Sequence, residues 1–305
     1  MVIEVRNLLK RYGGLIAVNG LSFEVKKGEI FGLLGPNGAG KTTTIRILMD
    51  IFKPDEGEVK VLGRNPSEVK EKVGYLPEER GLYQNLGTLE ILLYFAQLKG
   101  VPSSLAKERA ISLLEKVDLL DRAKGKVKEL SKGMQQKLQF IASIIHDPEV
   151  VFLDEPFQGL DPVNVELIKG LITELREQGK TVVLSSHQMN LVEALCDRIL
   201  LINKGEAVLY GPIQEIKKQF TPNSILVKSP QLPPVITGVQ AVTRKDDAFL
   251  LTLAEGTSPQ AVIKALVEEG VELEAFEVAP VPLEDIFVKV VKEGKAQCAS
   301  LKSGL

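Results

Sequence analysis

Gly35-Pro36-Asn37-Gly38-Ala39-Gly40-Lys41-Thr42-Thr43 decides the fold of this chain. The stretch follows the pattern G-x-x-x-x-G-K-[ST], a glycine-rich loop whose backbone can surround phosphate groups. The apolar run 29–34 before it is typical of a buried strand, and residues 43–49 after it carry apolar side chains at helical spacing. Strand, loop and helix start together predict an anion site, because loop N–H groups and a helix N-terminus both attract phosphate.

The residues of this loop suit a nucleoside triphosphate. Lys41 would supply a mobile positive charge for the β- and γ-phosphates, and Thr42 would offer a hydroxyl to Mg²⁺. The glycines allow an approach that a Cβ would block. A chance match to this pattern in a chain of 305 residues has a frequency of about one per cent. We therefore predict that the chain binds a nucleoside triphosphate.

Length and composition restrict the other classes of function. A chain of 305 residues has room for two domains, and its net charge of −2 gives no basic field that would favour nucleic acid. No apolar run has the length of a membrane span, and the N-terminus lacks the features of a signal peptide. Cys196 and Cys298 have no metal or redox spacing, so we expect two reduced thiols. These features predict a cytoplasmic protein.

The order of patterns predicts the domain organisation. Residues 1–30 alternate as an antiparallel edge sheet, and strands then alternate with helices up to residue 220, as in a parallel sheet with helices on both faces. A helical insert over about 84–148 interrupts this α/β core; Thr88, and Ser103 or Ser104, are its expected helix caps. We predict a P-loop NTPase core over 1–220.

A second composition shift, rich in proline, follows Thr221. Three short strands within 223–253, a helix from Ser258-Pro259 to Gly270, a strand over 272–278 and a helix over 283–292 predict a small C-terminal α/β domain over 221–293. Residues 294–305 have the composition of a flexible tail.

Two adjacent carboxylates, Asp154 and Glu155, follow the apolar run 150–153. The carboxyl end of a buried parallel strand is where α/β folds place ligands. Asp154 would hold Mg²⁺, and Glu155 would orient or deprotonate an attacking water. The alternative is a solvated acid pair at a strand end, which the phosphate loop upstream makes less favourable.

Two further features have both a structural and a functional interpretation. Ser131, within Leu130-Ser131-Lys132-Gly133-Met134, either caps the following helix or forms a second anion site with the N–H of Gly133. Tyr12 is either an ordinary turn residue or a flat surface on which a nucleobase stacks.

The sequence resembles the nucleotide-binding subunit of an ATP-binding cassette (ABC) transporter over residues 1 to about 215. The resemblance rests on the phosphate loop, the 130–134 signature, the Asp154-Glu155 pair, the loop Gly159-Leu160-Asp161 and His187 after Ser185-Ser186. Segments 74–83 and 282–287 resemble one subgroup, the bacterial exporters of sodium, drugs and polysaccharides. ATPases of that subgroup often carry a small additional C-terminal domain.

The resemblance implies a role for each matching residue. Glu155, His187 and Lys41 would be catalytic, with His187 contacting the γ-phosphate, while Thr42, Asp154 and Glu78 would hold Mg²⁺. ATP would be bound by Tyr12, Asn37, Gly38, Ala39, Gly40, Lys41, Thr42 and Thr43, and by Ser131, Gly133 and Asp161 of a second subunit.

The chain departs from the family pattern at two places. Glu78 stands where a glutamine is usual, which adds a negative charge near the triphosphate and puts its role in question, and Glu79 is a possible substitute. Lys132 and Met134 replace a glycine and a glutamine in the signature, but Ser131 and Gly133 are kept.

We therefore expect the ATPase subunit of an ABC exporter, with ATP and Mg²⁺ as cofactors. It would act as a homodimer or heterodimer on separate membrane permease subunits at the inner face of the cell membrane, without nucleic acid. A short permease helix would dock between the helical insert and the loop 78–83. The rival interpretations are a soluble ABC ATPase acting on the ribosome or DNA, and a nucleotide-binding regulator with little turnover.

Overall fold

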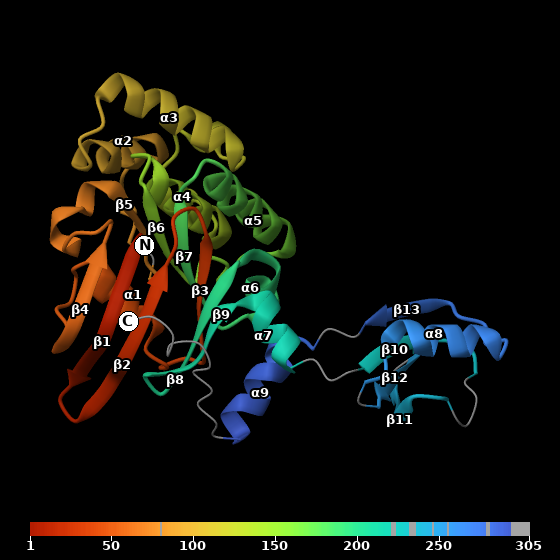
Figure 1. The fold of residues 1–305 in the computed structure, drawn as a ribbon. Coiled ribbons are helices and arrows are strands. Elements are labelled where there is room, and N and C mark those ends of the chain that lie inside the picture. The colour runs from red at the N-terminus through yellow and green to blue at the C-terminus, as the bar shows by residue number, and fades with distance from the viewer. Residues whose placement is uncertain are drawn as a thin grey trace. The chain divides into compact units, whose positions relative to one another are not determined.

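The computed structural model describes residues 1–79, 81–220, 224–231, 236–245, 247–254, 256–278 and 281–293 (Figure 1). The described chain forms two compact units, which meet between Ile213 and Gln214. The sequence placed this boundary at residue 220, so the helix that precedes it belongs mostly to the second unit. The expected tail 294–305, together with Arg80 and Cys298, lies outside the described residues.

The first unit is built on a six-stranded sheet. Its strands are β3 (Ile30–Leu34), β5 (Val73–Leu76), β6 (Val150–Asp154), β7 (Thr181–Ser186), β8 (Arg198–Asn203) and β9 (Glu206–Pro212). Their order is β5-β6-β7-β3-β8-β9, and all are parallel except β9, which pairs antiparallel with β8. The alternation of strands and helices predicted the parallel part, and the β9 edge strand was not predicted.

Alternate residues of β3 face opposite sides of this sheet. Phe31 and Leu33 belong to the main hydrophobic core, which includes helix α1 (Lys41–Leu48). Gly32 faces the other way, where a Cβ would lie 2.9 Å from Val192 of helix α6 (Met189–Leu195). Helix α5 (Pro162–Glu177) packs beside β7. The central strands are therefore covered on both faces, which explains their continuous apolar sequences.

A three-stranded antiparallel sheet, in the order β2-β1-β4, lies over the α1 side. Its strands are β1 (Ile3–Tyr12), β2 (Leu15–Val25) and β4 (Glu56–Val61). Phe23 of this sheet stacks on Phe31 with ring centroids 5.7 Å apart, so both sheets share one core. The expected antiparallel edge sheet is confirmed, and β4 completes it.

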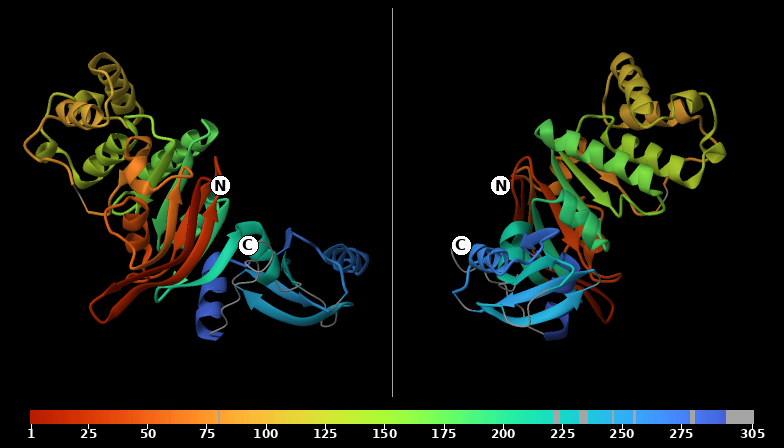
Figure 2. Two further views of the ribbon diagram at one scale, coloured as in Figure 1. Left: turned by 60° about the vertical axis from the view of Figure 1, so that its left-hand side comes forward. Right: turned by 90° about the vertical axis from the view of Figure 1, so that its right-hand side faces the viewer.

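The helical insert contains α2 (Thr88–Leu98), α3 (Ser103–Lys116) and α4 (Lys132–Ile144). Short 3₁₀ turns occupy Pro66–Glu68 and Lys70–Lys72 before the insert, and Leu120–Arg122 and Val127–Glu129 within it. Figure 2 shows α2 and α3, in yellow, projecting on the side away from the red strands β1 and β2. None of the helices in the described ranges is long and apolar enough to cross a membrane.

Two expected caps in the insert are wrong. Gly87 occupies the cap position of α2, where its N–H donates to Glu90 Oε2 (3.0 Å). Thr88 is instead the first helical residue, because its N–H and hydroxyl both bind the carbonyl of Gly125. Pro102 precedes α3, so Ser103 already lies within that helix. These ends were set by contacts that are distant in sequence.

The second unit begins with α7 (Ile213–Phe220), which the sequence patterns did not predict. Its four-stranded antiparallel sheet has the order β11 (Val239–Lys245), β12 (Ala248–Leu253), β10 (Ser224–Lys228) and β13 (Ala275–Val278). Helix α8 (Pro259–Glu268) covers one face through Val262 and Leu266, and α9 (Leu283–Glu293) follows. Ser258 caps α8 as expected, accepting from the N–H of Ala261.

His146, just after α4, gives the first unit a predictable sensitivity to acid. Its Nε2 lies 3.1 Å from the carbonyl of Val73, and its Nδ1 is buried without a hydrogen bond. Burial, and then the ammonium of Lys99, lower the pKa of His146 to about 4, although the Val73 bond and Asp147 raise it and Arg109 lowers it further. The folded state therefore favours the neutral ring. The neutral ring stabilises the folded state fully above pH 6.5, and this stabilisation is lost as the pH falls toward 4.

Between pH 7.5 and 5 we expect the free energy of unfolding to fall less in His146→Gln than in the wild-type chain. The amide can still donate to Val73 but takes up no proton. The difference between the two falls should be about 1–2 kcal/mol after allowing for partial exposure. Urea unfolding at both pH values measures it. Lys60→Gln, at an exposed position on β4, is the control and should keep the original pH dependence. Equal pH dependence in both variants would contradict the assignment.

Candidate active site

The phosphate loop lies between β3 and α1, and close packing explains two of its glycines. Gly40 begins α1 with a φ of 108°, and a Cβ there would lie 2.4 Å from the carbonyl oxygen of Ala17. A Cβ at Gly35, where φ is 151°, would lie 2.2 Å from the carbonyl oxygen of Ile202. Both positions therefore require glycine.

The loop borders a cavity of about 560 Å³. All seven of the loop residues predicted to bind ATP line it, together with Tyr12, Leu15, Ile16, Ala17, Glu78, Glu155 and Lys204. The structure thus brings the expected base-binding residue, the phosphate loop and two acids to one cavity.

Lys41 is nearly buried at the floor of this cavity. Its Nζ donates to the carbonyl oxygens of Gly35 (2.8 Å) and Pro36 (3.3 Å) and lies 3.5 Å from Glu155 Oε1. The ammonium is therefore held inside the loop, with an acid as its counter-charge.

Asp154 lies at the end of β6 and is fully buried. Its Oδ1 accepts from the hydroxyls of Thr42 (3.2 Å) and Ser185, while its Oδ2 has no hydrogen-bond partner in the described chain. Burial raises the pKa of Asp154; the two hydroxyls oppose that rise, Glu155 adds to it and Lys41 opposes it. A hydroxyl and a carboxylate with an unused oxygen are the donors that Mg²⁺ prefers, so this pair fits a magnesium ion.

Glu155 is held between two nitrogen-bearing side chains. Its Oε1 is 3.5 Å from Lys41 Nζ, its Oε2 is 3.0 Å from His187 Nδ1, and its N–H donates to Ser185 Oγ (3.1 Å). The backbone of Glu155 has a φ of +49°, a left-handed conformation that is unfavourable for a non-glycine residue. These contacts fix the carboxylate at the cavity wall.

Helix α4 connects the signature to this site. Ser131 caps the helix by accepting from the N–H of Met134 (3.2 Å), which confirms the capping interpretation. Gln136 donates to the carbonyl of Pro156, and Gln139 Nε2 donates to the carbonyls of Pro77 (3.2 Å) and Glu79 (3.0 Å). One helix therefore holds the residue after Glu155 and both neighbours of Glu78.

Five predicted residues do not line the Lys41 cavity of the described chain. Asp154 and His187 contact residues that do line it, Thr42 and Glu155, whereas Ser131, Gly133 and Asp161 make no such contact within the described residues. Ser131 is exposed, Gly133 is half-buried, and Asp161 caps α5 by accepting from the N–H (2.9 Å) and Nδ2 (2.6 Å) of Asn164. The backbone hydrogen bond from Asn164 lowers the pKa of Asp161. Ser131 and Asp161 are therefore accessible to solvent in the described chain.

Tyr12 lies at the end of β1 and is 42% exposed. Its ring makes an edge contact with Phe52 (6.0 Å between centroids), the ammonium of Lys10 lies over the ring 5.7 Å from its centroid, and the side chain lines the cavity. The exposed side chains of Leu15 and Ile16 line the same end. This end of the cavity is apolar and suits a nucleobase.

Sequence reasoning missed the roles of Ser185, Gln139 and Lys204. Ser185 is paired in register with Asp154 across β6 and β7, so two strand ends known to be adjacent would have revealed it. Gln139 and Lys204 left no comparable signal, because their contacts depend on how α4 and the β8–β9 hairpin pack.

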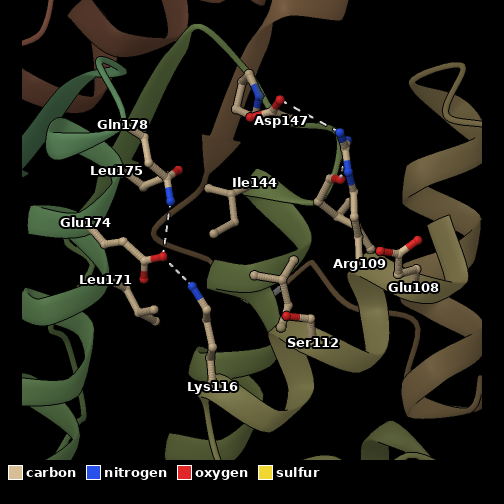
Figure 3. Close-up of a pocket in the computed structure, with 13 residues that line it drawn as sticks. Glu108, Arg109, Ser112, Lys116, Ile144, Asp147, Leu171, Glu174, Leu175 and Gln178 are labelled. Carbon is tan, nitrogen blue, oxygen red and sulfur yellow. Dashed lines mark hydrogen bonds and ion pairs between the residues drawn. The ribbon is translucent and has the colours of Figure 1, made fainter. Parts of the chain in front are cut away.

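A second cavity, of about 250 Å³, lies between α3, the end of α4 and α5 (Figure 3). Glu174 of α5 contacts both Lys116 of α3 and Gln178 at its rim, and Arg109 pairs with Asp147 (3.7 Å). It contains none of the predicted site residues. The Lys116–Glu174 pair connects α3 of the helical insert to α5.

Comparison with known proteins identifies the family of this chain. The family model described as ABC transporter matches residues 18–158, and the chain is 37% identical to the ABC transporter ATP-binding protein YhaQ of Bacillus subtilis (strain 168) over 95% of this chain and 98% of that one. The chain belongs to the ABC transporter family. A second model, the C-terminal domain of ATP-binding protein DrrA1-3-like, matches residues 211–291. The recognition made from the motifs is confirmed.

Two further similarities bear on the activity of this ABC subunit. It is 38% identical to the linearmycin resistance ATP-binding protein LnrL of B. subtilis (strain 168), over 74% of each chain. It also resembles a dimeric ATP-binding cassette solved in a post-hydrolysis state with ADP and phosphate, with a TM-score of 0.65 and 26% identity over 69% of this chain and 98% of that one. The P-loop fold is confirmed, and the chain is an ABC ATPase that binds ATP.

Proposed function

We propose that this ABC ATPase energises export through separate membrane permease subunits. The observation that supports ATP hydrolysis is the position of Glu155. Its carboxylate lies between Lys41 and His187, next to the Asp154–Thr42 pair. Export is supported by the similarity to a drug-resistance ATPase and by the DrrA-like match over residues 211–291. For the C-terminal unit we propose an assembly or regulatory role, since its described part has no glycine-rich loop or paired carboxylates at a strand end.

In this proposal the cavity is the ATP site. Adenine stacks on Tyr12, and the phosphates lie along the loop, with Lys41 at the β- and γ-phosphates. Mg²⁺ would be held by Thr42, Asp154 and Glu78, and it would neutralise charge on the phosphates. Glu78 keeps an oxygen ligand where a glutamine is usual.

Glu155 is the proposed general base for the attacking water. Its carboxylate is placed by the backbone bond to Ser185 and by His187. A neutral His187 that donates through Nδ1 to Glu155 presents Nε2 as an acceptor. Donation to a γ-phosphate oxygen therefore requires the His187 ring to turn away from Glu155 or to take a second proton.

A complete site requires two subunits in this proposal. Cassettes of this family function as dimers with membrane permease components. Ser131, Gly133 and Asp161 do not line the Lys41 cavity of their own chain, but the N-terminus of α4 can meet the γ-phosphate bound to a partner. The proposal applies equally to a homodimer and to a heterodimer of related subunits.

The permease is proposed to bind beside α2. A cleft of about 250 Å³ lies between α2, α4 and the segment after β5; Tyr75, Pro77, Leu82 and Phe95 are among its lining residues. Nearby Tyr83 is 54% exposed, and its ring contacts Tyr94 edge-to-face (5.7 Å). An apolar helix of the permease fits this surface, which would hold the ATPase at the inner face of the membrane.

Cross-linking from Tyr83→Cys tests this assignment. In a Cys298→Ser background, with Cys196 left in place because it is buried, a bifunctional thiol reagent applied to cells should capture an integral membrane protein. Lys60→Cys, an exposed position on β4, is the control and should not capture it. Capture of a ribosomal protein or a nucleic-acid-binding protein from Tyr83→Cys would instead favour the soluble rival.

A further inference from the structure

The β8–β9 hairpin packs directly against the phosphate loop. The N–H of Gly205 donates to the carbonyl of Ala39 (3.0 Å), and the carbonyl of Gly205 accepts from the N–H of Asn19 (2.8 Å). At the other end of the loop, the carbonyl of Ile202 occupies the space that a side chain at Gly35 would need. The hairpin therefore supports both ends of the loop, and its turn is held at the cavity edge.

Lys204 occupies this turn and lines the ATP cavity. Lys204 and Gly205 have φ angles of +50° and +81°, and Asn203 pairs with Glu206 across them, which describes a two-residue turn of the primed type. Lysine is not a favoured residue at such a position, where asparagine, aspartate and glycine dominate. The backbone of Lys204 is therefore somewhat strained in this turn.

The charge of Lys204 has no counter-charge in the described part of the chain. No carboxylate there lies within ion-pair distance of its ammonium, and the neighbouring Glu206 instead accepts from Asn19 Nδ2 (2.8 Å). Lys41, in contrast, is already bonded to two carbonyls and paired with Glu155. Lys204 is therefore a cation at the cavity that remains available to an anionic ligand.

The neighbours of Lys204 locate the part of the nucleotide that it would meet. Tyr12 marks the base end of the cavity, and Lys41 marks the β- and γ-phosphate end. Gly205, next to Lys204, donates to the carbonyl of Ala39 and lies against the backbone of Ala17, and both alanines line the same cavity. In a nucleotide the α-phosphate lies between the base and the β-phosphate, so it is the phosphate that Lys204 would meet.

We propose that Lys204 is a further nucleotide-binding residue, which pairs with the α-phosphate. Its long, flexible stem lets the ammonium follow the phosphate chain as a point charge. The contact adds affinity for nucleotide diphosphates and triphosphates alike, because both carry the α-phosphate. The inference rests on the ATP site described above.

Isothermal titration of the full chain with ADP tests the proposal. Lys204→Gln, which removes the charge and shortens the side chain by one atom, should weaken ADP binding by about three- to twentyfold, between the effects of an exposed ion pair and a charge-assisted hydrogen bond. Lys204→Arg should retain most of the affinity. Lys60→Gln removes the same charge from an exposed site away from the cavity and should leave ADP affinity unchanged. An unchanged affinity in Lys204→Gln would overturn the proposal.

A second titration separates the phosphate from the ribose. If Lys204 binds the α-phosphate, the losses from Lys204→Gln and from replacing ADP by 2′-deoxy-ADP should add, because they concern different groups. Non-additive losses would assign Lys204 to the ribose hydroxyl and overturn the α-phosphate contact. In either case, ADP binding by Lys60→Gln shows that the ATP site itself is present, so failure of the Lys204 proposal is distinguishable from failure of the site.

Discussion

Glu155→Gln is expected to lower the rate of phosphate release from ATP by about 10²–10⁴-fold, or about 3–5 kcal/mol in the barrier. The carboxylate is fixed by Ser185, His187 and Lys41, and the amide keeps its shape but loses the charge that accepts a proton from water. ATP affinity should not fall, since Lys41 loses a competing counter-charge while Thr42 remains unchanged. Phosphate release and ATP titration on the same protein measure both quantities.

The same variant should accumulate as an ATP-bound dimer, because closure still occurs and the hydrolysis that reopens it is blocked. Size-exclusion chromatography with and without Mg-ATP would show the shift. Glu78→Gln is the matched control: it removes a charge from the same cavity but restores the residue usual in the family, so it should retain turnover. Near-normal phosphate release by Glu155→Gln, with loss in Glu78→Gln, would move the general base to Glu78.

Mixing two inactive variants should restore hydrolysis if the site is shared between subunits. Lys41→Ala removes the phosphate-binding cation, and Ser131→Arg blocks the N-terminus of α4, so each alone should lose about 10²–10³-fold in rate. In the mixed dimer, one site combines the intact Lys41 of one chain with the intact Ser131 of the other. Random exchange should give about a quarter of the wild-type rate per subunit.

The control mixture combines Lys41→Ala with a chain carrying both Lys41→Ala and Ser131→Arg. No dimer in that mixture contains Lys41, so its rate should stay at the level of the single variants. Phosphate release over a range of protein concentrations measures both mixtures. A first mixture no faster than the average of its two components would show that each chain completes its own site.

Local patterns predicted the central strands and the phosphate loop because each depends on a few neighbouring residues. The apolar run 150–153, for example, places Asp154 at a strand end in any parallel sheet. The start of α2 was misplaced because Thr88 bonds to Gly125, a contact that no local pattern reveals. Edge strand β9 was missed for a similar reason, since it is defined by antiparallel pairing with β8.

The residues of the active site also divide into those that local sequence predicted and those that it did not. Lys41, Asp154 and Glu155 were predicted from residue type and position. In the structure Lys41 and Glu155 line the cavity with Thr42, and the buried Asp154 accepts from the Thr42 hydroxyl. Ser185 acts through its neighbour on another strand, and Gln139 through carbonyls about sixty residues earlier. Such contacts depend on strand order and helix packing, which a single sequence does not specify.

Helix α4 has a consequence for communication between two bound nucleotides. In the proposed dimer its N-terminus would present Ser131 to a partner's triphosphate, while Gln139 further along bonds to the backbone on both sides of Glu78 in its own chain. A rigid helix cannot shift at one end without moving the other. By thermodynamic reciprocity, whatever free energy the partner's ATP gains by positioning α4 must reappear as an equal change in affinity at the Glu78 side. The two sites of such a dimer would therefore bind ATP cooperatively, with one helix per subunit as the connection.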